Sequence, residues 1–122
     1  MTYKCRVVVA YKSELIPTAP VDGKCTIVYW DICGLAQSIR MALVLAGADF
    51  CDVRIDAGSP DSSDYKQVWF NRKPDIGNIM PFPNLPYYMD GNSGVVLSQS
   101  NAILKSIGRQ NNLLGPIAKE YI

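Results

Sequence analysis

Three short motifs constrain this chain more than any other feature, because each lies where extended sequence gives way to a turn or a helix. The first is YWDICGLA over residues 29–36, which follows a run of β-branched and aromatic residues. The second is PNLPY over residues 83–87, and the third is SQSNAI over residues 98–103. Their order and intervals predict one specific arrangement of strands and helices.

The sequence around the motifs has the pattern of an α/β domain. Residues 24–30 predict a buried strand, and apolar residues at helical spacing predict a helix over 34–47. The remaining predictions are a strand over 53–56, a short helix over 64–72, a hairpin of 86–89 with 95–97, and a last helix over 100–109. This order, βαβαββα, predicts the α/β fold class and a thioredoxin-like domain, with a mixed sheet between helices.

A further segment precedes this pattern. It contains a strand-like run over residues 6–11 and a stretch with proline and glycine over residues 16–23. We therefore expect an N-terminal extension over residues 1–24, the thioredoxin-like domain over 25–115 and a short tail over 116–122.

Composition excludes several classes of function. The chain has 122 residues, 48% apolar and 19% charged, which suits one soluble domain. Its formal charge of +1 offers no electrostatic surface for nucleic acid. The most apolar stretch, residues 41–48, is much shorter than the roughly 20 residues of a transmembrane helix. Because the chain has no histidine and its four cysteines form no Cys-x-x-Cys pair, we expect no metal site.

The cysteine pattern also favours a reducing compartment, and we expect a cytoplasmic protein. The first 13 residues contain Lys4, Arg6 and Lys12 but no acidic residue. This leaves import into mitochondria or plastids, as part of a complex, as the alternative.

Together the three motifs resemble the N-terminal, glutathione-binding domain of glutathione S-transferases. The closest resemblance is to the mu class, in which the first strand ends in Tyr-Trp and later segments carry Asn-Leu-Pro-Tyr and Gln-Ser-Asn-Ala-Ile. It covers about residues 25–115. Full-length members continue with a helical domain that supplies most of the pocket for the electrophile, and we expect that domain to be absent here because the chain stops at Ile122.

The resemblance implies glutathione as the substrate and assigns roles to individual residues. Tyr29 matches the tyrosine whose hydroxyl stabilises the glutathione thiolate. Leu85, before a cis-Pro86, would pair through its backbone with the cysteinyl unit, and Gln99 with Ser100 would bind the γ-glutamyl carboxylate at a helix N-terminus. Trp69 and Lys73 match positions that hold the glycyl carboxylate, Lys66 stands where the family often has arginine, and Trp30 and Asn84 complete the binding set.

Cys33 departs from the mu pattern, which has arginine at that position. Residues 33–36, CGLA, resemble the Cys-Pro-x-Ala of omega-class transferases and glutaredoxins, whose cysteine is nucleophilic. A cysteine at a helix N-terminus can form a thiolate and then a mixed disulfide with glutathione.

Three functions remain open at this point. The first is a domain that binds glutathione and activates its thiol for conjugation. The second is a non-catalytic accessory subunit of a larger assembly, with a protein partner on the face that the helical domain would cover. The third is a thiol transferase that depends on Cys33.

Overall fold

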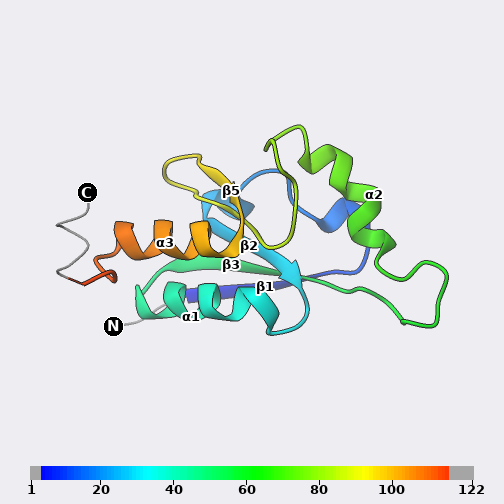
Figure 1. Ribbon diagram of the computed structural model, residues 1–122, viewed down its shortest axis with the longest axis horizontal. Helices are drawn as coiled ribbons and strands as arrows, with labels where there is room; N and C mark the ends of the chain where they lie inside the picture. Colours follow the sequence, from blue (N-terminus) through cyan, green and yellow to red (C-terminus); the bar gives the residue numbers. More distant parts are fainter. Residues whose placement is uncertain (1–3, 116–122) are drawn as a thin grey trace.

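The computed structural model describes residues 4–115 of the chain, and its strands form one five-stranded mixed sheet in the order β1-β3-β2-β4-β5 (Figure 1). The elements, with η marking short 3-10 helices, are β1 (Lys4–Ala10), η1 (Ser13–Leu15), η2 (Val21–Gly23), β2 (Cys25–Trp30), η3 (Gly34–Ala36), α1 (Gln37–Leu45), β3 (Asp49–Ile55), α2 (Gln67–Ile76), β4 (Tyr87–Met89), β5 (Val96–Ser98) and α3 (Ser100–Gln110). The predicted thioredoxin-like plan is confirmed from β2 to α3.

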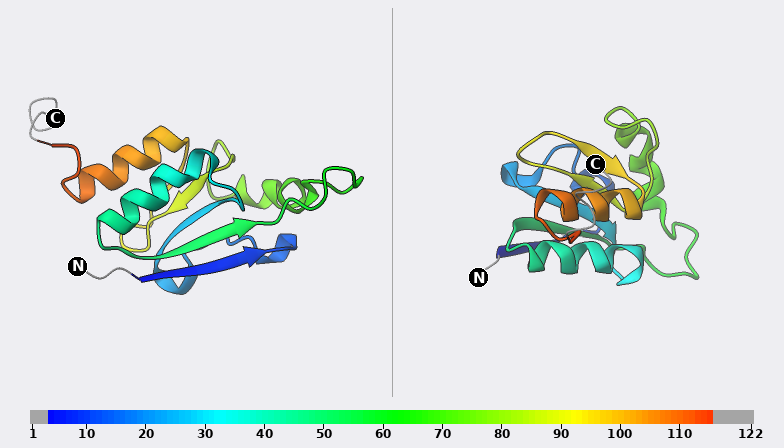
Figure 2. Two further views of the ribbon diagram at one scale, coloured as in Figure 1. Left: turned by 90° about the horizontal axis from the view of Figure 1, so that it is seen from below. Right: turned by 60° about the vertical axis from the view of Figure 1, so that its left-hand side comes forward.

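The sheet separates two apolar cores. Helices α1 and α3 lie side by side on one face, while α2 lies on the other (Figures 1 and 2). Successive side chains of a strand point to opposite faces. Accordingly Ile27 and Tyr29 of β2 pack beneath α1 and α3, whereas Val28 packs with Trp69 of α2.

Strand β1 is the feature that the βαβαββα plan does not contain. It lies within the segment that we expected to be an extension, and it pairs in parallel with β3 over its whole length. Since β3 also pairs in parallel with β2, it becomes a central strand. This position accounts for the complete burial of Cys51, Val53 and Ile55, which point to the α2 face and are covered there.

The connection from β1 to β2 passes over the α2 face. The β1-to-β2 connection and the β2-α1-β3 connection cross the sheet in opposite directions. Because both are right-handed crossovers between parallel strands, they have to lie on opposite faces of the sheet. Ile16 at the centre of the β1-to-β2 connection is 0% exposed. The Ser13 hydroxyl donates a hydrogen bond of 2.8 Å to the carbonyl of Val68, and Arg72 Nε donates one of 3.0 Å to the carbonyl of Ile16. This connection therefore supports helix α2.

Two predicted elements have different bounds in the structure. The strand predicted over 53–56 begins earlier, at Asp49, because β3 is paired on both sides. The helix predicted over 64–72 was misplaced and spans Gln67–Ile76 instead. Lys66 has a left-handed φ of 66°, which a right-handed helix cannot contain, so α2 begins after it.

All four cysteines are free thiols. None of the helices within residues 4–115 is both long and apolar enough to cross a membrane.

Burial of Ile16 gives a test of whether the segment before β2 stabilises the domain. We expect Ile16→Ala to lower the free energy of unfolding by about 2–5 kcal/mol, because it leaves a cavity between α2 and the sheet. The matched control is Glu14→Ala in the same segment, where an exposed side chain should change stability by less than about 0.5 kcal/mol. Denaturant unfolding measures both, and equal stability of the two variants would contradict the assignment.

Candidate functional site

The three sequence motifs meet at one end of the sheet. Val28 near the end of β2 lies opposite Tyr87 at the start of β4, and Tyr87 lies opposite Ser98 at the end of β5. The residues that follow β2, precede β4 and follow β5 therefore lie at the same end of the sheet. Segments separated by more than fifty positions in the sequence are brought together by strand register alone.

Tyr29 is held in a defined orientation at this end. Its side chain is 8% exposed, and its hydroxyl oxygen accepts a hydrogen bond of 3.4 Å from the backbone N–H of Leu35. A Cβ atom at Gly34 would lie only 2.7 Å from that oxygen, so the loop can approach the tyrosine this closely only with glycine there. A hydroxyl that accepts from an amide still has its own hydrogen to donate.

The segment before β4 contains the predicted cis peptide bond, between Leu85 and Pro86. The side-chain oxygen of Asn84 accepts a 2.9 Å hydrogen bond from the N–H of Leu85. A ligand that pairs with this N–H must first displace Asn84. The Ser98 hydroxyl donates a 2.7 Å hydrogen bond to the carbonyl of Phe82, which ties the segment to β5.

Helix α3 begins at this end of the sheet, after a residue with an unusual backbone conformation. Gln99 has φ 74° and ψ 111°, a backbone conformation that residues other than glycine rarely adopt. No side chain of the described residues caps α3. The structure therefore shows no capping by the side chain of Gln99 or Ser100. The first amides of the helix are free to bind an anion.

Two lysines on the α2 side carry positive charge. The Lys66 ammonium lies 5.6 Å from the centre of the Trp30 ring and 5.2 Å from that of Tyr65. Lys73 is half-buried on α2. Within the part of the chain that the structure describes, neither lysine forms a salt bridge. Both charges are available to a carboxylate ligand.

Trp69 belongs largely to the core. It is 3% exposed and stacks on Tyr87 with ring centres 6.1 Å apart. A contact with glutathione through this residue would have to use that small exposed part. Lys73 lies one helical turn further on the same side of α2.

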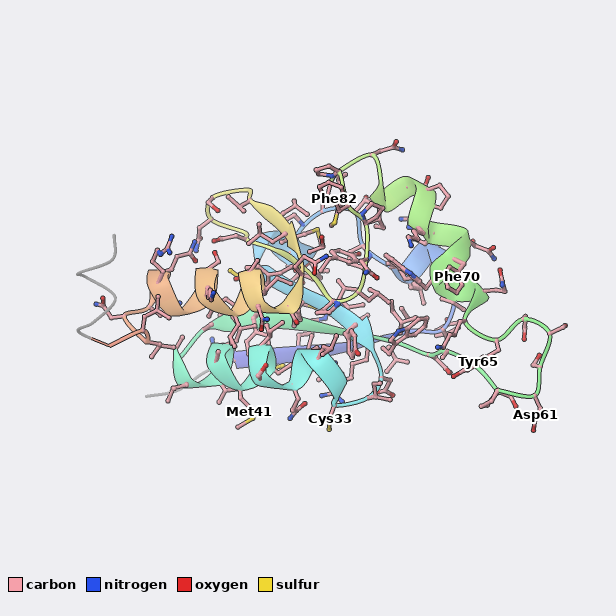
Figure 3. All side chains as sticks on the ribbon, in the orientation of Figure 1. Cys33, Met41, Asp61, Tyr65, Phe70 and Phe82 are labelled. Atoms are coloured by element: carbon pink, nitrogen blue, oxygen red, sulfur yellow. The ribbon has the colours of Figure 1, made fainter. Side chains whose placement is uncertain are left out.

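Cys33 is exposed immediately before η3 and points outward beside the N-terminal end of α1 (Figure 3). Its thiol is therefore accessible, as a thiol transferase would require. Its nucleophilic role stays a prediction.

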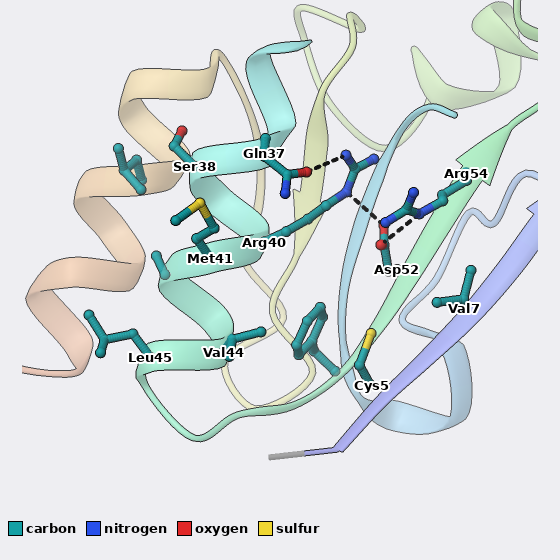
Figure 4. Close-up of a pocket in the computed structure, with 13 residues that line it drawn as sticks. Cys5, Val7, Gln37, Ser38, Arg40, Met41, Val44, Leu45, Asp52 and Arg54 are labelled. Carbon is teal, nitrogen blue, oxygen red and sulfur yellow. Dashed lines mark hydrogen bonds and ion pairs between the residues drawn. The ribbon is translucent and has the colours of Figure 1, made fainter. Parts of the chain in front are cut away.

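The sequence reasoning missed two residues that fix the loop after β2. Arg40 and Asp52 are 5% and 2% exposed and form an ion pair, with 3.1 Å between Nε and Oδ1 (Figure 4). Arg40 also donates hydrogen bonds to the carbonyls of Ile32 and Trp30, at 2.7 and 3.3 Å. Opposite charges inside two otherwise apolar segments, residues 39–43 and 50–53, were the signal that could have identified them.

Comparison with known proteins identifies the family of this chain. The family described as "Glutathione S-transferase, N-terminal domain" matches residues 25–109. Glutathione S-transferase Mu 7 of Mus musculus is 43% identical over 98 residues, which are 80% of this chain and 42% of that protein. A glutathione S-transferase of Dermatophagoides pteronyssinus is 44% identical over 94 residues, which are 77% of this chain and 41% of that protein.

Solved structures agree with this match. A Nu-class transferase from Haemonchus contortus is 31% identical with a TM-score of 0.56, covering 72% of this chain and 36% of that one. The glutathione S-transferase from Ascaris lumbricoides is 32% identical with a TM-score of 0.58, covering 77% of this chain and 40% of that one. The chain thus spans less than half the length of these relatives, and the part that it shares with them is their N-terminal domain. The chain belongs to the glutathione S-transferase family.

Proposed function

We propose that this domain binds glutathione at the end of the sheet where the three motifs meet, and that Tyr29 donates a hydrogen bond to the glutathione thiolate. The observation that carries the proposal is the hydrogen bond from the Leu35 N–H to the Tyr29 hydroxyl. It leaves the hydroxyl hydrogen as the donor. A thiol bound within reach of this donor is easier to deprotonate.

Each of the three units of glutathione has a chemically suitable group in the rest of the site. The uncapped N-terminus of α3 suits the γ-glutamyl carboxylate, because its amides and its dipole favour an anion. The backbone of Leu85, next to the cis peptide bond to Pro86, suits the peptide groups of the cysteinyl unit once Asn84 is displaced from its N–H. The unpaired Lys66, with Lys73 beyond it, suits the glycyl carboxylate.

The backbone of Gln99 supports the same proposal. A residue held in a sparsely populated conformation costs about 1–3 kcal/mol, and such residues gather at binding sites. Here the conformation places Gln99 immediately before the free amides of α3. We propose that Gln99 keeps this unfavourable conformation, despite its cost in stability, because the conformation orients a contact with glutathione.

An accessory role without turnover is the second candidate. The observation that favours it is a group of exposed apolar side chains around α1, with Leu35 58%, Met41 62% and Leu45 66% exposed. Exposed apolar surface of this kind often contacts another protein. For either role we propose a cytoplasmic location, since all four cysteines are free thiols.

Calorimetric titration of the 122-residue chain with glutathione separates the two roles. We expect saturable binding that Ser100→Ala weakens about three- to tenfold, because one hydrogen bond at the α3 N-terminus is lost. Ser106→Ala, further along the same helix, controls for an effect on helix stability and should leave the affinity unchanged. A folded chain that shows no binding at millimolar glutathione would refute the proposal and favour the accessory role.

Replacement of Tyr29 tests activation of the thiol separately from binding. Tyr29→Phe should raise the pKa of the bound glutathione thiol by about one to two units, because a hydrogen bond to a charged group contributes about 1.5–3 kcal/mol. The affinity should change little. Ultraviolet absorbance of the thiolate against pH measures the shift.

The controls for this measurement are Tyr88→Phe, on the neighbouring strand, and Cys33→Ser. Neither should change the pKa of the bound thiol. If Tyr29→Phe has no effect while Cys33→Ser abolishes thiol exchange with a glutathione mixed disulfide, the Cys33 hypothesis replaces the Tyr29 one.

Replacement of Gln99 tests whether its conformation serves binding. Gln99→Gly should leave the free energy of unfolding unchanged or raise it by up to about 2 kcal/mol, since glycine accepts a positive φ but loses more chain entropy. Glutathione affinity should fall about threefold or more, because a polar contact is lost. The matched control is Asn112→Gly, with φ 56° outside the site, which should not change affinity. Equal affinity of the two variants would contradict this role.

A further inference from the structure

The outer edge of β1 presents unpaired backbone groups. Lys4 N–H donates to the carbonyl of Ala48 at 3.3 Å, and the carbonyl of Ala10 accepts from Asp56 N–H at 2.9 Å. The N–H and C=O of one strand residue point to the same side and alternate along the strand. The even-numbered residues of β1 therefore face β3, and the groups of Cys5, Val7 and Val9 face away from it. No strand within residues 4–115 pairs with this edge.

This edge lacks the features that normally prevent strand pairing. Exposed edge strands are usually short, bulged, or interrupted by proline or charge. β1 keeps an uninterrupted register with β3 from Lys4 to Ala10. At its outward positions it carries cysteine and two valines, and Val7 and Val9 are 54% and 47% exposed.

The two charged residues of β1 do not block the edge. Lys4 and Arg6 lie at the positions whose backbone faces β3, and Arg6 forms an ion pair with Asp22. The side chains of Cys5, Val7 and Val9 all point to the α1 face, because they alternate with Val8 and Ala10, which pack in the α2-side core.

We propose that β1 pairs in antiparallel fashion with β1 of a second copy of this chain, about a twofold axis at Val7. In this register Cys5 lies opposite Val9 of the second copy, and Val7 lies opposite Val7. All the outward N–H and C=O groups of these three residues then meet a partner, which gives about six hydrogen bonds. The two sheets become one continuous sheet.

The strand is complementary to itself in this register, which is why a second copy is the favoured occupant. Lys4 lies opposite Ala10 and Arg6 opposite Val8, so no like charges face each other across the pair. The outward positions place apolar residues opposite apolar residues. A second copy has the matching pattern of charged and apolar residues by identity, whereas an unrelated strand would have to carry that pattern independently.

The apolar surface continues from the edge into a neighbouring groove. A groove of about 890 Å³ between α1 and the sheet is lined by Cys5 and Val7 on its floor and by Met41, Val44 and Leu45 on its wall (Figure 4). The second strand would extend this floor. Because a pair of seven-residue strands alone buries less than the roughly 800 Å² per partner of a stable interface, we expect a dimer that dissociates on dilution.

The first test is the mass of the full chain in solution against concentration. We expect the mass to rise from 13.5 kDa to twice that value. Val7→Pro should remain monomeric and folded, because it removes an N–H that makes no bond to β3 and proline is tolerated on such an edge. Val9→Lys should also remain monomeric, whereas Val95→Lys, at a site of similar exposure (44%) outside the edge, should still dimerise.

Amide hydrogen exchange gives a second readout. At high concentration the amides of Cys5, Val7 and Val9 should become protected at least tenfold relative to dilute protein, while those of the even-numbered residues stay protected throughout. A chain that is monomeric at every concentration would overturn the proposal. A dimer that persists in both Val7→Pro and Val9→Lys, with the odd-numbered amides unprotected, would show that the copies associate through another surface and would also overturn it.

Discussion

The buried ion pair of Arg40 and Asp52 is the interaction on which the candidate site depends. It joins α1 to β3, and the same guanidinium donates to the carbonyl of Trp30 at the end of β2 and to that of Ile32 in the loop that follows. Removing one partner of such a pair leaves an uncompensated charge and typically costs about 3–5 kcal/mol. The loop that it fixes leads directly to Gly34 and Leu35, whose backbone orients the Tyr29 hydroxyl. A buried charge pair thereby sets the direction of the proposed donor.

The segment before β2 supports the other side of the site. β1 turns β3 into a central strand, and the following connection fills the α2 face with Ile16. Polar contacts then tie this connection to α2 and to β4, including a 2.6 Å hydrogen bond from the Tyr87 hydroxyl to the carbonyl of Pro17. Because α2 carries Trp69 and Lys73, the stability of this segment and the geometry of the proposed glycyl side of the site are coupled.

The fold therefore separates two surfaces with different chemistry. Within residues 4–115, the end of the sheet offers uncapped amides, unpaired lysines and a hydroxyl, which suit a small polar ligand with carboxylates at both ends. The outer edge of β1 offers only backbone groups beside apolar side chains, which suit another strand. Binding at one surface leaves the other accessible, since they lie at the end and at the side of the same sheet.

The sequence by itself determined the order of elements from β2 to α3, the family, and the three motifs whose segments meet at the end of the sheet. These follow from local patterns: periodicity, turn residues and three contiguous motifs. Only the tertiary structure decided that β1 joins the sheet, that Trp69 is mostly core, and that Arg40 meets Asp52. It also showed that Asn84 occupies the Leu85 N–H, and that α2 begins after Lys66. Each of these depends on which segments pack together. The charges of Arg40 and Asp52 and the strand-like run over residues 6–11 are visible in the sequence. The partner that each one pairs with is decided only by tertiary packing.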